Sequence, residues 1–303
     1  MTLTELRYIL AVYQERHFGK AAKACFVSQP TLSVAVQKLE SSLKVILFER
    51  TKSEIKPTLA GEAIIHQAQR ILNEVQLLKQ VAANYRDPLT VPLRIGAIYT
   101  VGPYLFPHVI GELKKLAPQL PLLIEENYTS VLHQKITEGQ LDAIIVALPF
   151  EDPSLHMEPL YDEPFVVILP ADHPLTQYKK LIAMQLQTER LLVLGKNNCF
   201  RDQVLAISPR TPLATDASEL LPATLIESTS LETIRHMVAA NVGISILPKS
   251  ASGSGLYDTT IIAVREFEEP IPTRRIVLAS RKQFPHVAAI QLLQKAILSS
   301  GVL

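Results

Sequence analysis

Cysteine is scarce in this 303-residue sequence, which contains only Cys25 and Cys199. The two lie far apart in a chain that we expect to be cytoplasmic, so they exclude a structural disulfide framework and an all-cysteine zinc site. Any function of a cysteine here therefore has to be redox or nucleophilic. We predict no metal ion and no cofactor.

Long apolar segments and a secretion signal are also missing. Apolar residues make up 48% of the chain and charged residues 19%, and no apolar run approaches the length of a membrane span. The N-terminus carries Thr2, Glu5 and Arg7 within a periodic pattern and lacks the apolar stretch and cleavage site of a signal peptide. We therefore expect a cytoplasmic protein that makes no contact with a membrane.

The length and the charge distribution indicate that the chain consists of separate domains. A chain of 303 residues is too long for one compact core and predicts two or three domains. The net charge of +1 hides an asymmetry, because residues 1–60 hold nine lysines and arginines against five acidic residues, which leaves −3 for the remainder. The basic N-terminal end is where nucleic acid would bind.

The first 43 residues have the apolar periodicity of three short helices, of which the third is the clearest. Ser28 can cap this helix and Pro30 suits its first turn. Polar side chains on the outward face of a helix that follows a tight turn are used to read bases in the major groove, although a plain three-helix bundle would give the same pattern. The candidate DNA-binding residues on this helix are Gln29, Pro30, Thr31, Ser33, Val34, Gln37 and Lys38.

The segment that follows, residues 46–58, indicates a short two-stranded ribbon with a basic tip. Such a ribbon beside a helix-turn-helix is a wing. We expect Arg50, Lys52 and Lys56 to lie on the phosphate backbone, where they would supply affinity that does not depend on sequence.

Residues 58–85 form one long predicted helix whose apolar residues are spaced alternately by four and three. A strict seven-residue repeat predicts pairing with a second helix, most simply the same helix of another subunit. The alternative is a helix that packs on its own domain. Pro88 and Pro92 then end the helix and mark a linker.

Beyond residue 93, apolar strands alternate with helical patterns, which is typical of an α/β domain with a parallel sheet. Open sheets of this kind bind ligands at the carboxyl ends of their strands. The expected strands are 93–98, 120–125, 141–148, 165–169, 191–194, 224–227, 244–247 and 276–279, and the expected helices are 104–116, 132–138, 199–207 and 231–240.

Several strings resemble a known family. The segment 17–50 contains AA, VSQPTLS, KLE and LFER, and it resembles the DNA-binding domain of LysR-type transcriptional regulators. The strings GAIYTVGPYLFPH (96–108), LDAIIVALP (141–149), LYDEPF (160–165), CFRDQ (199–203) and SLETIRHMVAA (230–240) are similar to the peroxide-sensing members of that family. The resemblance covers almost the whole chain.

The resemblance implies an α/β fold with an N-terminal winged helix-turn-helix, a long dimerisation helix and a two-lobed effector domain like a periplasmic binding protein. We place the DNA-binding domain at 1–58, the dimerisation and linker helix at 59–92 and the effector domain at 93–303. Within the effector domain, lobe I spans about 93–161 and 268–303, and lobe II spans about 162–267. The implied assembly is a dimer or a tetramer.

The residues around Cys199 suggest a reactive thiol on their own chemistry. Cys199 begins a predicted helix with Asn198 as a plausible cap and Arg201 close behind, and both features favour a thiolate. The alternative is an inert, buried cysteine that fills space before an apolar helix. Cys25 lies between two helices of the DNA-binding domain and is expected to be a core residue.

The resemblance adds roles for neighbouring residues. It implies that Cys199 is the peroxide-reactive cysteine, that Thr100 and Thr129 supply hydroxyls, and that a resolving cysteine would stand where this chain has Ser208. Asn198 also replaces a histidine that commonly precedes the reactive cysteine. A serine cannot form a disulfide, so we expect oxidation to stop at sulfenic acid and the structure to have the reduced arrangement.

These observations predict a transcriptional regulator, not an enzyme, with hydrogen peroxide as effector. Its expected partners are double-stranded DNA with an inverted-repeat operator, further copies of the same chain, and RNA polymerase if the protein activates transcription. One alternative is a regulator of the same architecture that binds a small anionic metabolite between its lobes. Another is a one-cysteine peroxidase, which the wing and the seven-residue repeat disfavour.

Overall fold

The chain divides into two units, residues 1–86 with 137–140 and residues 87–136 with 141–303. This computed structural model describes residues 1–50, 55–84, 89–196, 198–208, 225–253, 258–282 and 284–301. Within these ranges, no helix combines the length and the hydrophobicity needed to cross a membrane.

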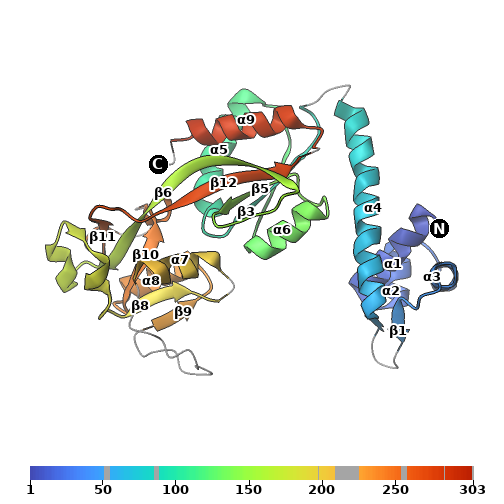
Figure 1. Cartoon of the computed structure of the whole chain (residues 1–303), viewed down its shortest axis with the longest axis horizontal. Coiled ribbons are helices and arrows are strands. Elements are labelled where there is room, and N and C mark those ends of the chain that lie inside the picture. Colours follow the sequence, from blue (N-terminus) through green and yellow to red (C-terminus); the bar gives the residue numbers. More distant parts are fainter. Residues whose placement is uncertain are drawn as a thin grey trace. The chain divides into compact units, whose positions relative to one another are not determined.

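The N-terminal unit begins with the three predicted helices, α1 (Leu3–Glu15), α2 (Phe18–Ala24) and α3 (Gln29–Leu43) (Figure 1). Local sequence fixes where they begin. Thr2 and Glu5 form a capping box on α1, and the Ser28 hydroxyl accepts a hydrogen bond from the Thr31 amide at the start of α3. The apolar stripe of α3 lies in a core that α1 and α2 complete, and this core includes Leu6, Ile9, Val12, Phe18, Ala21, Leu32, Val36 and Leu39.

The predicted ribbon is present as β1 (Phe48–Arg50) and β2 (Ile55–Pro57), which pair antiparallel. Glu40 of α3 fixes its entry, since one carboxylate oxygen accepts from the amides of Leu47 at 2.8 Å and Phe48 at 3.3 Å. The ribbon is therefore held against α3. Its tip, including Lys52, lies outside the described residues.

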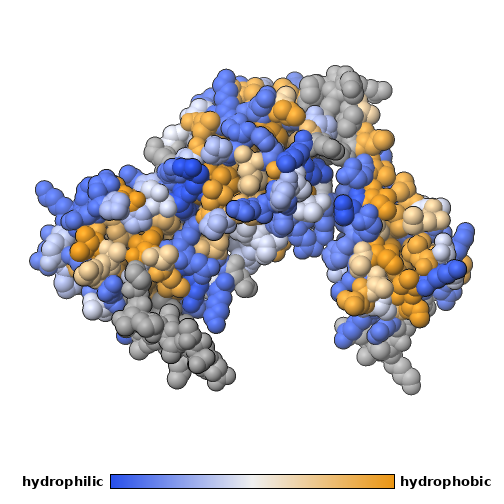
Figure 2. Space-filling model, in the orientation of Figure 1, coloured by the Kyte–Doolittle hydropathy of each residue, from blue (hydrophilic) through white to orange (hydrophobic). Residues whose placement is uncertain are grey.

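Helix α4 (Leu59–Asn84) follows the ribbon, close to the predicted 58–85. Its first half packs on its own unit, because Ile65 and Ala68 are buried in the N-terminal core. Farther along, Leu78 is 71% exposed, and Figure 2 shows hydrophobic surface along α4. The alternative of a helix packed on its own domain is thus correct for the first half, and pairing between subunits stays a prediction for the second half.

The C-terminal unit contains one sheet that continues through two lobes (Figure 1). In lobe I, β3 (Leu93–Ile98) pairs in parallel with β4 (Leu122–Asn127) and β5 (Ala143–Ala147). The return strand β12 (Thr273–Arg281) is antiparallel to β5 and to β6 (Leu155–Pro170). The expected parallel sheet is therefore present only in part, because the chain leaves lobe I on β6 and returns on β12, and both strands are antiparallel to their neighbours. Helices α5 (Gly102–Leu116), α6 (Thr129–Thr137) and α9 (Val287–Ser299) complete this lobe.

Lobe II is built on the second half of β6, which pairs with β10 (Ile244–Pro248) and β11 (Ile262–Phe267). Strands β8 (Leu191–Leu194) and β9 (Leu225–Ser228) extend the sheet in parallel with β10, while β7 (Lys180–Leu181) pairs with β11. Helices α7 (Cys199–Ile207) and α8 (Leu231–Ala239) pack on it, with 3-10 turns at Pro174–Gln177, Ala183–Leu186 and Lys249–Ser252. The boundary placed at 161/162 falls inside β6, a single strand that enters both lobes.

A buried histidine in lobe I predicts a pH-dependent stability. His286 is 3% exposed, and neither ring nitrogen has a hydrogen-bond partner among the described residues. Burial lowers the pKa of His286, with Asp142 opposing this effect and Arg94 adding to it. As pH falls through about 6.5, the unfolded chain takes up a proton that the folded chain does not, so stability should decrease.

The measurement is the melting temperature between about pH 8 and about pH 5.5. We expect a flatter profile for His286→Met than for the wild type, because methionine fills the site without titrating. His156→Gln, at an exposed position on β6, is the matched control. Parallel profiles for His286→Met and the wild type would contradict the assignment.

Candidate functional site

Cys199 is the first residue of α7 and is partly buried. Asn198 caps this helix as predicted, since its side-chain oxygen accepts from the Phe200 amide at 3.1 Å. Although α7 belongs to lobe II, the Cys199 side chain packs against the core of lobe I. A chemical change at this sulfur would therefore act where the two lobes meet.

The Cys199 sulfur lies 3.6 Å from the hydroxyl of Thr129, the first residue of α6. Both line a cavity of about 10 Å³, with Tyr99, Asn127 and Tyr128 also in its wall. This volume is about what one water-sized molecule requires. The structure thus brings together a thiol, a hydroxyl and a space that could accept a small oxygen species.

Thr100 occupies a different position from Thr129. Its hydroxyl accepts from the Arg274 guanidinium at 2.8 Å, and its carbonyl accepts from the same group. Arg274 also pairs with Glu163, and both side chains are buried, 1% and 0% exposed. Ser250 completes the network by donating to Glu163. Thr100 is therefore held in a buried ionic network that joins the two lobes, and no described contact links it to the thiol.

The described contacts of the Arg201 side chain lie within lobe II. Its guanidinium donates to the Leu194 carbonyl and pairs with Glu227, which neutralises most of its effect at a distance. Sequence order placed Arg201 near the thiol, but its side chain lies on lobe II and bonds to β8 and β9. No described contact joins the Arg201 side chain to Cys199.

Ser208 lies at the opposite end of α7, where its amide donates to the Val204 carbonyl. The side chain is fully buried, and its hydroxyl has no hydrogen-bond partner among the described residues. Ser208 follows Cys199 by nine positions along the helix, which corresponds to a rise of about 13 Å. Because a disulfide needs Cα atoms about 4.4–6.8 Å apart, the two positions cannot be bridged while α7 is intact.

The predicted DNA-binding residues of α3 lie on its solvent side. Ser33 is half-buried and the others are exposed, namely Gln29, Pro30, Thr31, Val34, Gln37 and Lys38. Lys56 of the wing is also exposed. The side chain of Arg50 lies outside the described residues, as does Lys52. The predicted DNA-binding residues that the structure describes are therefore accessible to a groove of DNA.

Both parts of the chain match known protein families. Residues 3–62 match the family of bacterial regulatory helix-turn-helix proteins of the lysR type, and residues 86–300 match the LysR substrate binding domain. The chain belongs to the LysR family. The sequence expectation of a LysR-type fold is therefore confirmed.

Within the LysR family, the chain is similar to regulators called OxyR. It is 36% identical to the DNA-binding transcriptional dual regulator OxyR of Escherichia coli, over 98% of this chain and 95% of that protein. The structure of full-length OxyR from Pseudomonas aeruginosa, in a cysteine-to-aspartate variant, has 48% identity and a TM-score of 0.79, covering 100% of this chain and 96% of that one. A peroxide-bound cysteine-to-serine variant of Corynebacterium glutamicum OxyR has 28% identity and a TM-score of 0.62, covering 99% and 92%.

Sequence reasoning missed the residues that join the site to both lobes. Glu163 and Arg274 lie 111 positions apart, and no local pattern pairs them. Gln203 was also missed, although its amide nitrogen donates from α7 to the Leu148 carbonyl of lobe I at 2.9 Å. The signal that could have found it is its spacing of four from Cys199, which places both on one face of α7. Across the described ranges, no group of three or more histidine, cysteine or acidic residues could hold a metal ion.

Proposed function

We propose that this chain is a DNA-binding transcriptional regulator that responds to hydrogen peroxide through Cys199. The single observation that carries the proposal is the Cys199 thiol at the start of α7, 3.6 Å from the Thr129 hydroxyl. The similarity to OxyR proteins over the full chain supports it.

The chemistry follows from the parts present. The thiolate sulfur attacks one peroxide oxygen, a sulfur–oxygen bond forms and the oxygen–oxygen bond breaks. The departing hydroxide takes up a proton and leaves as water, so the sulfur is oxidised to sulfenic acid and peroxide is reduced. The Thr129 hydroxyl is placed to donate a hydrogen bond to oxygen in the small cavity. Thr100 is held by Arg274 and lines a second cavity, which Tyr99 and Tyr128 share with the cavity at Cys199.

Cys25 provides an internal control for this proposal. Burial raises the pKa of the Cys25 thiol, so less of it is thiolate at neutral pH. With limiting peroxide, we expect sulfenic acid at Cys199 and unmodified Cys25, measured by trapping with a sulfenic-acid probe and peptide mass spectrometry. Equal labelling of the two cysteines, or labelling of Cys25 alone, would contradict the proposal.

The N-terminal unit supports recognition of DNA by α3 and the wing. We propose that α4 pairs with the same helix of a second subunit, which gives two recognition helices and an operator with inverted half-sites. A tetramer would contain two such pairs. If the regulator activates transcription, RNA polymerase is a further partner.

Gln29 tests base readout because it is exposed at the start of α3. Replacing it with alanine should reduce discrimination between operator and altered operators by roughly 1 to 3 kcal/mol, since an amide reads base edges. Gln14→Ala, at an exposed position of α1, is the control and should leave the preference unchanged. Binding would be measured by gel shift at fixed salt. A uniform loss for all DNA sequences would count against base readout by Gln29.

A further inference from the structure

A second cavity, of about 370 Å³, opens between lobes I and II beside the thiol site. Lobe I contributes Tyr99, Tyr104, Tyr128 and Glu126 to its wall, and Ser230 and Glu232 come from lobe II. A cavity of this volume takes a small organic molecule, whereas the cavity at Cys199 has room for only one water-sized molecule. The two cavities share Tyr99 and Tyr128 as a common wall.

Glu126 brings an uncompensated carboxylate to this cleft. No hydrogen bond or ion pair joins its side chain to any residue in the described part of the chain. It packs over Gly102 at the start of α5, where an added Cβ would lie 2.8 Å from a carboxylate oxygen. Burial raises the pKa of Glu126, as expected for a partly desolvated carboxylate without a cationic partner.

Glu232 faces the same cleft from the first turn of α8. One carboxylate oxygen accepts from the Tyr104 hydroxyl at 2.8 Å and lies 3.4 Å from Arg235. The other oxygen is buried and has no partner among the described residues. Arg235 also donates to two backbone carbonyls, so it offsets the charge of Glu232 only in part.

This arrangement disfavours the anionic effector that was considered from the sequence. The starts of α5 and α8 would attract an anion, as helix N-termini do. Glu126 already covers the start of α5, and Glu232 lies in the first turn of α8, whose Ser230 side chain caps the Thr233 amide. An added anion would meet two carboxylates.

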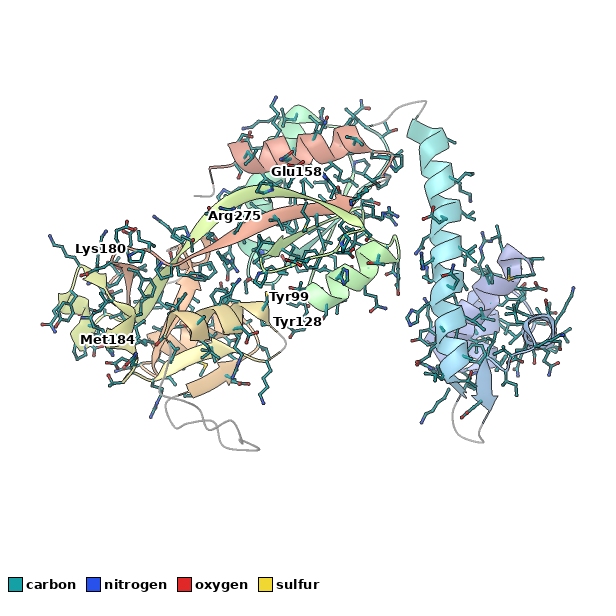
Figure 3. The ribbon with its side chains drawn as sticks, in the orientation of Figure 1. Tyr99, Tyr128, Glu158, Lys180, Met184 and Arg275 are labelled. Atoms are coloured by element: carbon teal, nitrogen blue, oxygen red, sulfur yellow. The ribbon has the colours of Figure 1, made fainter. Side chains whose placement is uncertain are left out.

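The aromatic rings in the wall of the cavity favour a cationic ligand. Tyr99 and Tyr128 meet edge to face with their centroids 5.2 Å apart, and Figure 3 shows them side by side at the ends of β3 and β4. Tyr104 adds a third ring from α5. Aromatic faces combined with carboxylates are the side chains that bind organic cations.

We propose that this cleft binds a protonated organic amine, with its ammonium group between Glu126 and Glu232 and its body against the tyrosine rings. Because Tyr99 and Tyr128 also line the Cys199 cavity, a bound amine contacts the wall of the thiol site. The site would thus add a cationic effector to the proposed redox response, and it does not depend on that response.

The test uses the reduced full chain and two matched probes, 2-phenylethylammonium and 3-phenylpropionate, with binding measured by isothermal titration calorimetry. We expect the ammonium to bind and the carboxylate not to bind. Glu126→Gln and Glu232→Gln should each weaken the ammonium by about tenfold or more, because each removes a charge-assisted contact. Glu158→Gln, at a half-buried position of β6 outside this cavity, should leave the affinity for the ammonium unchanged.

Two variants of Tyr99 distinguish a contribution of its aromatic ring to binding from an effect on folding. Tyr99→Phe should retain the affinity for 2-phenylethylammonium and Tyr99→Leu should weaken it several-fold, with unchanged melting temperatures in both. The proposal is overturned if 3-phenylpropionate binds as tightly as the ammonium, if neither probe binds at about 10 mM, or if both glutamine variants bind like the wild type. Sulfenic acid formation at Cys199, measured separately, tests the proposed function regardless of this outcome.

Discussion

Replacing Arg274 with methionine should lower the free energy of unfolding of the C-terminal unit by about 3 to 5 kcal/mol. The change removes one partner of a fully buried ion pair and leaves the Glu163 carboxylate without its cation. It also removes the donors to the Thr100 hydroxyl and carbonyl. Far-UV circular dichroism in urea is the measurement, because the chain has no tryptophan to report by fluorescence.

The neighbouring pair supplies the control for this prediction. Arg275, labelled in Figure 3, forms an ion pair with Asp162 at 2.7 Å on the same two strands, but both side chains are exposed. Arg275→Met should therefore have little effect on the urea midpoint. The double variant Arg274→Met/Glu163→Gln should recover much of the lost stability, because no buried charge remains. Equal effects for Arg274→Met and Arg275→Met would contradict this account.

The N-terminal unit was predictable because its determinants are local. Caps such as Ser28 and the apolar stripe of α3 act within a few residues, and the structure has them where the sequence placed them. The long strand β6 was only partly predicted, because Pro159 and Pro164 interrupt the apolar pattern of its first half. Prolines are accommodated there because this half of β6 pairs with β12 alone among the described strands and the register shifts beside Pro159, between Ile276 and Val277. Both features depend on β12, which is more than a hundred residues away.

The candidate site was predictable only where its determinants are local. Asn198 as a cap and Cys199 at the helix start depend on adjacent residues, and both are as expected. The partner of Arg201 is Glu227, and the partner of Thr100 is Arg274, so each depends on how distant strands are arranged. Spacing along the chain carries no information on such pairs, so the sequence could not show that Arg201 pairs with Glu227.

Replacing Ser208 with cysteine should convert a reversible sulfenic acid into a peroxide-driven intrachain disulfide. Cys199 sulfenic acid would be attacked by the new thiolate, a sulfur–sulfur bond would form and the sulfenic oxygen would leave as water. The hydroxyl of Ser208 is buried without a described partner, so a thiol should fit there and stabilise the reduced protein by about 1 kcal/mol. Intact-mass analysis would detect the loss of two hydrogens, and peptide mapping would locate the bond.

This disulfide cannot form while α7 is intact, so we expect its formation to be accompanied by a large change in structure. A rise of about 13 Å separates the two positions in α7, so closing the bond requires most of the helix to unwind. Unwinding would also remove the contact of Gln203 with lobe I and displace Phe200 from the lobe II core. We therefore expect oxidised Ser208→Cys to lose helical circular dichroism, to become sensitive to proteases within 199–208 and to change its DNA footprint. Cys199→Ser/Ser208→Cys is the control and should do none of these. A disulfide that formed with α7 still protected from proteases would show that the helix is not the element that rearranges.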